Sequence, residues 1–265
     1  MLPLICIDVD GTLVGSSHVP TDAVWAAAAA AVERGQHLAI STARGAFGVT
    51  DDYARRLDPD GWHIFHNGAS LVHTGSGEIR TTPLDGAVVD TAEEVADRNG
   101  WVIEFYTATD FCADTDADLA RDHAAMLGMP HRRRGRSALE GDLARVQFVV
   151  PLEVVPWVRT EMAGTGVIVV PATSPVMPGV AFVSCTMPGV TKGAAIRTIA
   201  DELDTTVERV MMVGDGLNDL DAVTTAGHGV AMGNAVDEVK AAARHHVAHV
   251  DDDGLVEALE LSATL

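Results

Sequence analysis

The stretch that most constrains this chain is residues 5–14, which read Ile-Cys-Ile-Asp-Val-Asp-Gly-Thr-Leu-Val. Its short apolar run predicts a buried strand of a parallel sheet. Asp8 and Asp10 follow at the end of that strand, and ligands of open α/β sheets bind just beyond the carboxyl ends of strands. Two carboxylates placed so closely repel each other unless a cation or a reaction needs them. A plain Asp-Gly turn is the alternative interpretation of these residues.

The chain has 265 residues and a formal net charge of −20, from 38 acidic and 18 basic residues. This length holds one large domain or two modest ones. The acidic excess argues against a nucleic-acid-binding protein, because binding to phosphate backbones depends on Lys and Arg. The one basic exception is the run from Arg132 to Arg136. We interpret it as a solvated loop, with a contact to an anionic substrate group as the alternative.

No stretch approaches the uninterrupted run of about 20 apolar residues that a membrane helix needs. The first residues lack the basic region and the small-residue cleavage site of a signal peptide. We therefore expect a cytoplasmic protein that does not bind membranes and that is a monomer or a small homo-oligomer. The cysteines Cys6, Cys112 and Cys185 show neither metal spacing nor a disulfide framework, and we expect Cys6 and Cys185 in the core.

Strands and helices alternate at both ends of the chain. Over the first 82 residues, the pattern after the opening strand predicts a helix at 24–33, a strand at 37–40, a helix at 46–57, a strand at 62–65 and a hairpin at 70–81. Near the other end it predicts helices at 191–203, 237–243 and from 254, a shorter helix up to 226, and strands at 207–213, 229–232 and 246–250. This alternation predicts a doubly wound parallel sheet, a Rossmann-like α/β core with right-handed crossovers.

Residues 83–187 follow a different pattern, in which paired strands and helices occur without carboxylates at the strand ends. Strands are predicted at 101–106, 111–113, 145–150, 167–171 and 180–186, and helices at 87–98, 119–127 and 152–163. We interpret this segment as an inserted α+β domain, flanked by Pro83 and Pro188 as hinges. Residues 1–82 and 188–265 then form the core domain.

Polar residues at four strand or helix ends of the core are expected to converge, because these ends lie side by side at one edge of a doubly wound sheet. Besides Asp8 and Asp10, they are Thr42, Lys192, Asp215, Asn218 and Asp219. Three or more carboxylates make a hard, oxygen-rich site that suits Mg²⁺. A hydroxyl and an ammonium beside that metal suit a phosphate group. For Lys192 alone, a surface helix position is the alternative.

These motifs together resemble the haloacid dehalogenase-like phosphohydrolases, in the Cof-type branch that carries a large α/β cap after the third core strand. Residues 8–13, Asp-Val-Asp-Gly-Thr-Leu, match the first motif of that superfamily, Lys192 matches the third, and residues 214–219 match the fourth. Residues 42–44 match the second but read Thr-Ala-Arg where the branch usually has Thr-Gly-Arg. Further stretches typical of this branch occur at residues 67–69, 230–235 and 252–255. The inserted domain resembles the family's cap in its layout only.

The resemblance implies a role for each acidic residue of these motifs. Asp8 would be the nucleophile that forms an aspartyl-phosphate, and it would also bind Mg²⁺. Asp10 would protonate the leaving alkoxide and then deprotonate the attacking water, with its backbone carbonyl on the metal. Asp215 would complete the protein's metal ligands, and Asp219 would orient them.

The resemblance also implies that Thr42, Lys192 and Asn218 hold the oxygens of the transferred phosphoryl group. Ala43 places a methyl group where the family usually has glycine and where the backbone approaches phosphate. We expect Arg44 to pair with a carboxylate, with a substrate contact as the alternative. Asn67 is expected either at the junction of core and cap or as a turn residue.

The predicted function is a Mg²⁺-dependent phosphatase of small-metabolite phosphomonoesters, such as sugar phosphates, whose cap closes over the site. A phosphomutase of the same superfamily and a non-catalytic phosphometabolite-binding protein are the alternatives. A dehalogenase is disfavoured because its chemistry does not need the acid that Asp10 supplies. An ion-pump domain is disfavoured because that group carries threonine at the Asp10 position.

Overall fold

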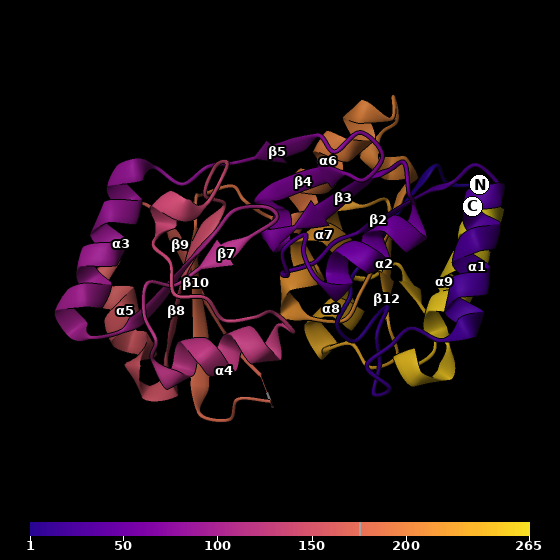
Figure 1. Ribbon diagram of the computed structural model, residues 1–265. Helices are drawn as coiled ribbons and strands as arrows, with labels where there is room; N and C mark the ends of the chain where they lie inside the picture. Colours follow the sequence, from indigo (N-terminus) through magenta and orange to yellow (C-terminus); the bar gives the residue numbers. More distant parts are fainter. Residues whose placement is uncertain (175) are drawn as a thin grey trace. The chain divides into compact units, whose positions relative to one another are not determined.

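The computed structural model describes residues 1–174 and 176–265 (Figure 1). The chain forms two compact units. The core unit comprises Met1–Arg44, Asp52–Arg80 and Thr191–Leu265, and the cap unit comprises Gly45–Asp51 and Thr81–Val190. Each is described by itself below. No helix of the described residues is both long and apolar enough to cross a membrane.

The core unit is built on a five-stranded sheet in the order β13-β12-β11-β1-β2. Its strands are β1 (Leu4–Ile7), β2 (His37–Ile40), β11 (Val210–Gly214), β12 (His228–Ala231) and β13 (His245–His246). Each neighbouring pair is parallel, and all four residues of β1 are buried. The parallel sheet confirms the predicted Rossmann-like α/β core. Two predicted strands are shorter than expected, because Val207–Arg209 form a 3₁₀ turn and only two residues of β13 pair.

Helices cover this sheet on the pattern of a doubly wound fold (Figure 1). They are α1 (Asp22–Glu33), α2 (Val49–Leu57), α6 (Lys192–Glu202), α7 (Leu220–Thr225), α8 (Asp237–Ala242) and α9 (Gly254–Thr264). Helices α6 and α7 share one hydrophobic cluster with the β1 residues Leu4 and Cys6, as predicted for that cysteine. Helices α1 and α9 pack against each other and against β2 and β11, respectively.

The third strand, β3 (Trp62–Phe65), differs from the prediction of a full member of the parallel sheet. A single parallel bridge from Ser41 to Ile64 joins it to the end of β2. Its main partner is β4 (Ser70–His73), and β4 lies next to β5 (Ile79–Thr81) in a separate three-stranded sheet. The predicted hairpin therefore forms, and β3 extends it.

The cap unit contains a second five-stranded sheet, in the order β7-β6-β8-β10-β9. Its elements are α3 (Gly86–Asn99), β6 (Val102–Tyr106), β7 (Phe111–Cys112), α4 (Asp118–Met126), β8 (Arg145–Pro151), α5 (Val155–Glu161), β9 (Ile168–Thr173) and β10 (Val180–Thr186). The strand pairs are antiparallel, which confirms the predicted α+β character of the insertion. Phe105 and Phe148 pack with α3 and α5 on one face, and Val149 and Phe182 pack with α4 on the other.

The segment Gly45–Asp51 belongs to the cap unit, although the sequence pattern placed it in a core helix beginning near residue 46. The Ala46 N–H donates a hydrogen bond to the Ala108 carbonyl at 2.8 Å. The Phe47 ring stacks on the Phe111 ring with 5.6 Å between their centres. These contacts accompany a bend at Ala46 and Phe47, and the helix begins only at Val49.

A set of buried polar residues lies on the α4 side of the cap sheet; we call it the cap polar cluster. It consists of Glu104, Tyr106, His123 and Gln147. The Glu104 carboxylate accepts hydrogen bonds from the Tyr106 hydroxyl at 2.6 Å and the Gln147 amide at 3.2 Å, and His123 Nδ1 lies 2.8 Å from it. Burial, and then the Glu104 charge, raise the pKa of Tyr106 well above its usual value.

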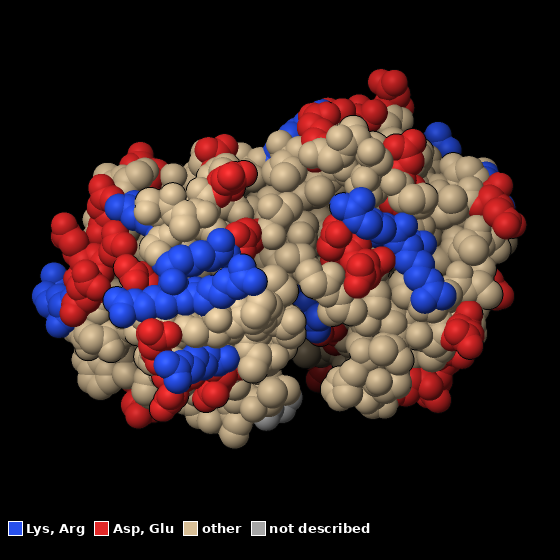
Figure 2. Space-filling model, viewed as in Figure 1, with Lys and Arg blue, Asp and Glu red and all other residues tan. Residues whose placement is uncertain are grey.

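The surface reflects the acidic composition of the chain. In Figure 2, Asp and Glu side chains are spread over both ends of the visible face, while Lys and Arg side chains gather in a few groups beside them. On this face, several of the basic groups therefore lie next to acidic side chains.

Candidate active site

A buried lysine holds two carboxylates together at the edge of the core sheet. Asp8 follows β1 and is buried, and Lys192 is the first residue of α6. The Thr191 side chain accepts a hydrogen bond from the Ala194 N–H and caps α6, which fixes where Lys192 leaves the helix. Lys192 Nζ lies 2.5 Å from Asp8 Oδ1 and 2.5 Å from Asp219 Oδ1, and its side chain is 0% exposed.

Asp8, Asp215 and Asp219 form a compact set, which we call the core acidic cluster. One carboxylate oxygen from each lies within 4.8 Å of the others. The second oxygen of Asp219 accepts hydrogen bonds from the N–H groups of Asp215 and Gly216, both at 3.0 Å. These bonds fix the loop after β11 so that Asp215 faces the cluster.

The core acidic cluster has more negative charge than the protein neutralises. Burial, and then the charge of Asp219, raise the pKa of Asp8 well above its usual value and the pKa of Asp215 to about 6. Burial opposes the charged form of Lys192, but the charges of Asp8 and Asp219 outweigh it and raise the pKa of that ammonium. Three carboxylates around one ammonium are therefore a site that a further cation would stabilise.

The loop after β1 approaches Asp215 so closely that only glycine fits at its turn. Gly11 has a φ of +87°, and a Cβ on it would lie 2.3 Å from Asp215 Oδ2. Thr12 donates to Asp215 Oδ1 at 3.3 Å. Asn234 donates to Asp215 Oδ2 at 3.2 Å and to the Gly11 carbonyl at 2.7 Å. Thr12 and Asn234 were not predicted as site residues, although both lie in phrases that resemble the family.

Asp10 lies outside the core acidic cluster and is held by Arg44. Its side chain is 62% exposed. Arg44 Nε donates to Asp10 Oδ2 at 2.9 Å, and the terminal nitrogen of Arg44 contacts the other carboxylate oxygen. This fork fixes the orientation of the carboxylate at both oxygens.

The remaining predicted residues gather on neighbouring loops of the core unit. Thr42 is buried; its hydroxyl accepts a hydrogen bond from the Arg44 N–H at 3.2 Å, and its carbonyl accepts one from the Asn67 N–H at 2.8 Å. Ala43, which lies between Thr42 and Arg44 in the sequence, is half-buried. The exposed Asn218 donates to the Asn67 side-chain oxygen at 3.4 Å. The second and fourth motifs are thus linked through Asn67.

The turn at Asn67 also reaches the start of α6. Asn67 has a left-handed backbone, with φ 55° and ψ 29°. At the next residue, Gly68, a Cβ would lie 2.2 Å from the Thr191 carbonyl oxygen, so a side chain there would force this loop away from Lys192. The glycine therefore allows the turn at residues 67–69, which is hydrogen-bonded to Thr42, to approach the third motif.

The donor set fits a hard divalent cation. Carboxylate oxygens are the ligands that Mg²⁺ prefers, and the cluster supplies them from two strand ends. Burial, and then the charge of Asp219, raise the pKa values of Asp8 and Asp215, so a cation beside them would favour their charged forms. Asp8 and Asp215 are the residues that would hold the ion, while Asp219 is fixed by Lys192 and by two backbone N–H groups and would orient them.

Comparison with known proteins gives the family. The model of the haloacid dehalogenase-like hydrolases matches residues 5–139 and 173–259. These ranges cover most of the chain, both units included, and the chain therefore belongs to that family. The resemblance predicted from the four motifs is confirmed.

Relatives and solved structures sharpen this assignment. The chain is 42% identical to the 5-amino-6-(5-phospho-D-ribitylamino)uracil phosphatase YcsE of Bacillus subtilis, but over 27% of this chain and 28% of that protein only. It is 25% identical to the putative phosphatase YxeH of the same organism over 98% of this chain and 97% of that protein. A solved sugar phosphatase of subclass IIB superposes with a TM-score of 0.79 at 23% identity, covering 99% of each chain. The chain therefore shares the fold of that subclass IIB structure.

Proposed function

We propose that this protein is a Mg²⁺-dependent phosphatase that hydrolyses phosphomonoesters of small metabolites. The observation that carries the proposal is the core acidic cluster with its buried Lys192 at the carboxyl ends of β1 and β11. Phosphoryl transfer requires positioning and charge neutralisation, and this arrangement supplies both once a cation is bound.

Asp8 is assigned as the nucleophile. Lys192 holds its Oδ1, and the other carboxylate oxygen attacks phosphorus, so that an aspartyl-phosphate forms as the bond to the ester oxygen breaks. Water then attacks the phosphorus, the aspartyl–phosphate bond breaks, and inorganic phosphate leaves. Asp8 and Asp215 would hold a Mg²⁺ ion, which would supply positive charge to the phosphoryl oxygens and to Asp8.

Asp10 is assigned as the general acid and base. It gives a proton to the leaving ester oxygen in the first step and takes one from the attacking water in the second. The Arg44 fork orients Asp10, which makes Arg44 a positioning residue. Thr42, Lys192 and Asn218, with the backbone at Ala43, are assigned to the oxygens of the transferred group.

The substrate class and the separate roles of the two domains are also proposals. The relatives named above are phosphatases, one of them for a phosphorylated ribityl compound, which supports a small phosphorylated metabolite with a polyol or sugar body. Residues 83–187 are assigned as the substrate-specificity domain, and residues 1–82 and 188–265 as the catalytic core. The cytoplasmic location and the monomer or small homo-oligomer stay predictions from the sequence.

The test is phosphate release from a panel of sugar, nucleotide and vitamin phosphates, in Mg²⁺ and in EDTA. We expect Mg²⁺-dependent release from a few chemically related compounds. If no compound of the panel releases phosphate while Mg²⁺ still binds, the proposal is contradicted and a phosphomutase or a non-catalytic binder is favoured. Isomerisation of a sugar phosphate without phosphate release would identify the mutase.

A further inference from the structure

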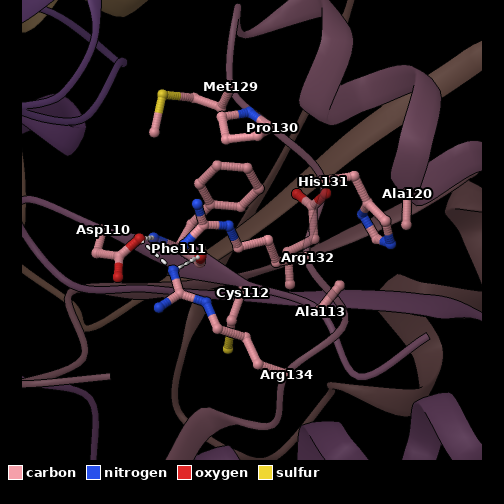
Figure 3. Close-up of a pocket in the computed structure, with 11 residues that line it drawn as sticks. Asp110, Phe111, Cys112, Ala113, Ala120, Met129, Pro130, His131, Arg132 and Arg134 are labelled. Carbon is pink, nitrogen blue, oxygen red and sulfur yellow. Dashed lines mark hydrogen bonds and ion pairs between the residues drawn. The ribbon is translucent and has the colours of Figure 1, made fainter. Parts of the chain in front are cut away.

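The cap unit contains a cavity of about 300 Å³ beside β7 and the loop after α4 (Figure 3). Its apolar lining includes Phe111, Cys112, Met129 and Pro130, and Arg132 and Arg134 also line it. A volume of this size is at the lower end of the range for small-molecule pockets, which are mostly apolar with a few polar groups.

Three of the four arginines between residues 132 and 136 are neutralised by carboxylates of the cap unit. Arg133 pairs with Asp114 at 2.9 Å, Arg134 pairs with Asp110, and Arg136 pairs with Asp90 at 2.5 Å and with Glu93 at 3.1 Å. Arg134 is further held by the Phe111 carbonyl at 2.8 Å, as Figure 3 shows. These arginines therefore have their partners within the protein.

Arg132 is different. Among the described residues it has no ion-pair partner, and it lines the cavity. Its side chain is exposed, whereas the paired Arg134 and Arg136 are partly buried. Its guanidinium is free to bind an anion with two parallel hydrogen bonds.

The apolar wall is fixed on one side and adaptable on the other. The Phe111 ring stacks on Tyr106 and on Phe47, with ring centres 5.3 Å and 5.6 Å apart, so its position is set. Met129 has an unbranched, polarisable side chain that adjusts to the shape of a ligand. Burial raises the pKa of the Cys112 thiol to about 11, so this side chain is a neutral part of the wall at physiological pH.

The carboxylates near the cavity leave no need for a cationic ligand. Glu104 lines the cavity but already accepts from Tyr106, Gln147 and His123, and Asp110 is paired with Arg134. We propose that this cavity binds a small organic anion, with its carboxylate or phosphate group on Arg132 and its apolar body against Phe111, Met129 and Pro130.

Such an anion has two sources. It is either the leaving portion of a substrate that carries a second anionic group, or a separate effector molecule. The binding site itself does not depend on the proposed phosphatase activity; only the first source rests on it.

The test is calorimetric titration of benzoate, an aromatic carboxylate, into the full-length protein. The key variant is Arg132→Ala, and the matched control is Arg133→Ala, which removes a neighbouring arginine that already has a partner. We expect equal affinity for the wild type and Arg133→Ala, and affinity weaker by about fivefold for Arg132→Ala. Thermal unfolding of all three proteins checks that the fold is unchanged.

Absence of benzoate binding, or equal binding by both variants, overturns the site. Benzyl alcohol, which lacks the charge, should bind more weakly than benzoate to the wild type and equally to all three proteins. Preference of the wild type for benzyl alcohol over benzoate overturns the assignment to an anion.

Enzyme kinetics distinguish the two sources of the anion. The reference substrate is p-nitrophenyl phosphate, which has no second anionic group. If the leaving portion occupies the cavity, Arg132→Ala raises KM only for substrates that carry a carboxylate or second phosphate. If an effector occupies it, benzoate changes the rate with p-nitrophenyl phosphate without competing with it. Benzoate binding in a protein that hydrolyses no phosphomonoester would contradict the proposed function and leave the site intact.

Discussion

The two units bury polar clusters of opposite design. In the core acidic cluster, three carboxylates share one ammonium, and burial with mutual repulsion raises the pKa values of Asp8 and Asp215. In the cap polar cluster, a single carboxylate, Glu104, meets three donors within the protein. The core acidic cluster has fewer positive charges than carboxylates, whereas the carboxylate of the cap polar cluster has its hydrogen-bond partners within the protein.

This difference separates a binding site from a structural network. A buried polar group that is fully hydrogen-bonded fixes the packing around it, whereas one left short of partners costs free energy until a ligand supplies them. The core cluster is therefore the place where a cation adds stability, and the cap cluster is the place where removing a partner loses it.

The largest effect is expected from Asp8→Asn. An amide does not attack phosphorus, so turnover should fall by at least about 10⁴-fold. Phosphate release under saturating substrate measures it, with Asp201→Asn, an exposed carboxylate on α6, as the matched control at normal activity. Near-normal turnover by Asp8→Asn would rule out the covalent mechanism.

Asp10→Asn should slow turnover by about 10²- to 10⁴-fold, because proton transfer to the leaving group is lost. Its side chain lies on Arg44 and outside the core acidic cluster, so the affinity for Mg²⁺ should change little. Calorimetry alongside the rate assay checks both. Loss of Mg²⁺ binding in this variant would show that the Asp10 carboxylate belongs to the metal site.

The sequence was sufficient to predict the parallel core sheet, the antiparallel sheet between its two halves and the strand ends at which Asp8 and Asp215 lie. These depend on local periodicity and on side chains placed directly after strands, as with Asp8 after β1 and Asp215 after β11. The close approach of Asp8, Asp215 and Asp219 follows from the parallel order of the sheet.

Other features depend on contacts that no local pattern specifies. The choice of Asp10 as the partner of Arg44 is one, and the stacking of Phe47 on Phe111, which draws residues 45–51 into the cap unit, is another. Asn234 reaches Asp215 from a different strand end. Glu104 is buried by the pairing of β6 with β8 and by the packing of α4, and neither contact can be read from a local pattern.

Glu104→Gln should destabilise the protein by about 1–3 kcal/mol, because the donors of Tyr106, His123 and Gln147 lose a charged acceptor. Urea unfolding measures the change. Mg²⁺ affinity should stay at the wild-type value. Unchanged stability would mean that the cap polar cluster is not a structural network.

In the absence of metal, Asp215→Asn should not lower the stability of the protein, in contrast to Glu104→Gln. Removing one of the crowded carboxylates relieves repulsion, so stability should be equal or higher, by at most about 2 kcal/mol after allowance for solvent screening. The stabilisation that Mg²⁺ gives the wild type should disappear. Thermal unfolding with and without Mg²⁺ shows both effects, and a metal-free protein clearly less stable than the wild type would contradict the repulsion.

The smallest effect is expected in the pH dependence of the stability difference between the metal-free wild type and Asp215→Asn. The raised pKa of Asp215, about 6, means that the folded protein keeps a proton there that the unfolded chain has lost. The stability of the metal-free wild type relative to Asp215→Asn should therefore fall as pH rises from about 4 through 6. Urea unfolding of both proteins across this range measures it; a difference that is constant or grows with pH would show that burial does not hold that proton.

The most direct test of the contrast between the two clusters is calorimetric titration of Mg²⁺ into the wild type, Asp215→Asn and Glu104→Gln at neutral pH. The account predicts one Mg²⁺ bound per wild-type chain, the same affinity in Glu104→Gln, and no detectable binding in Asp215→Asn. Undiminished binding by Asp215→Asn, or none by the wild type, would contradict the assignment of the core acidic cluster as the metal site.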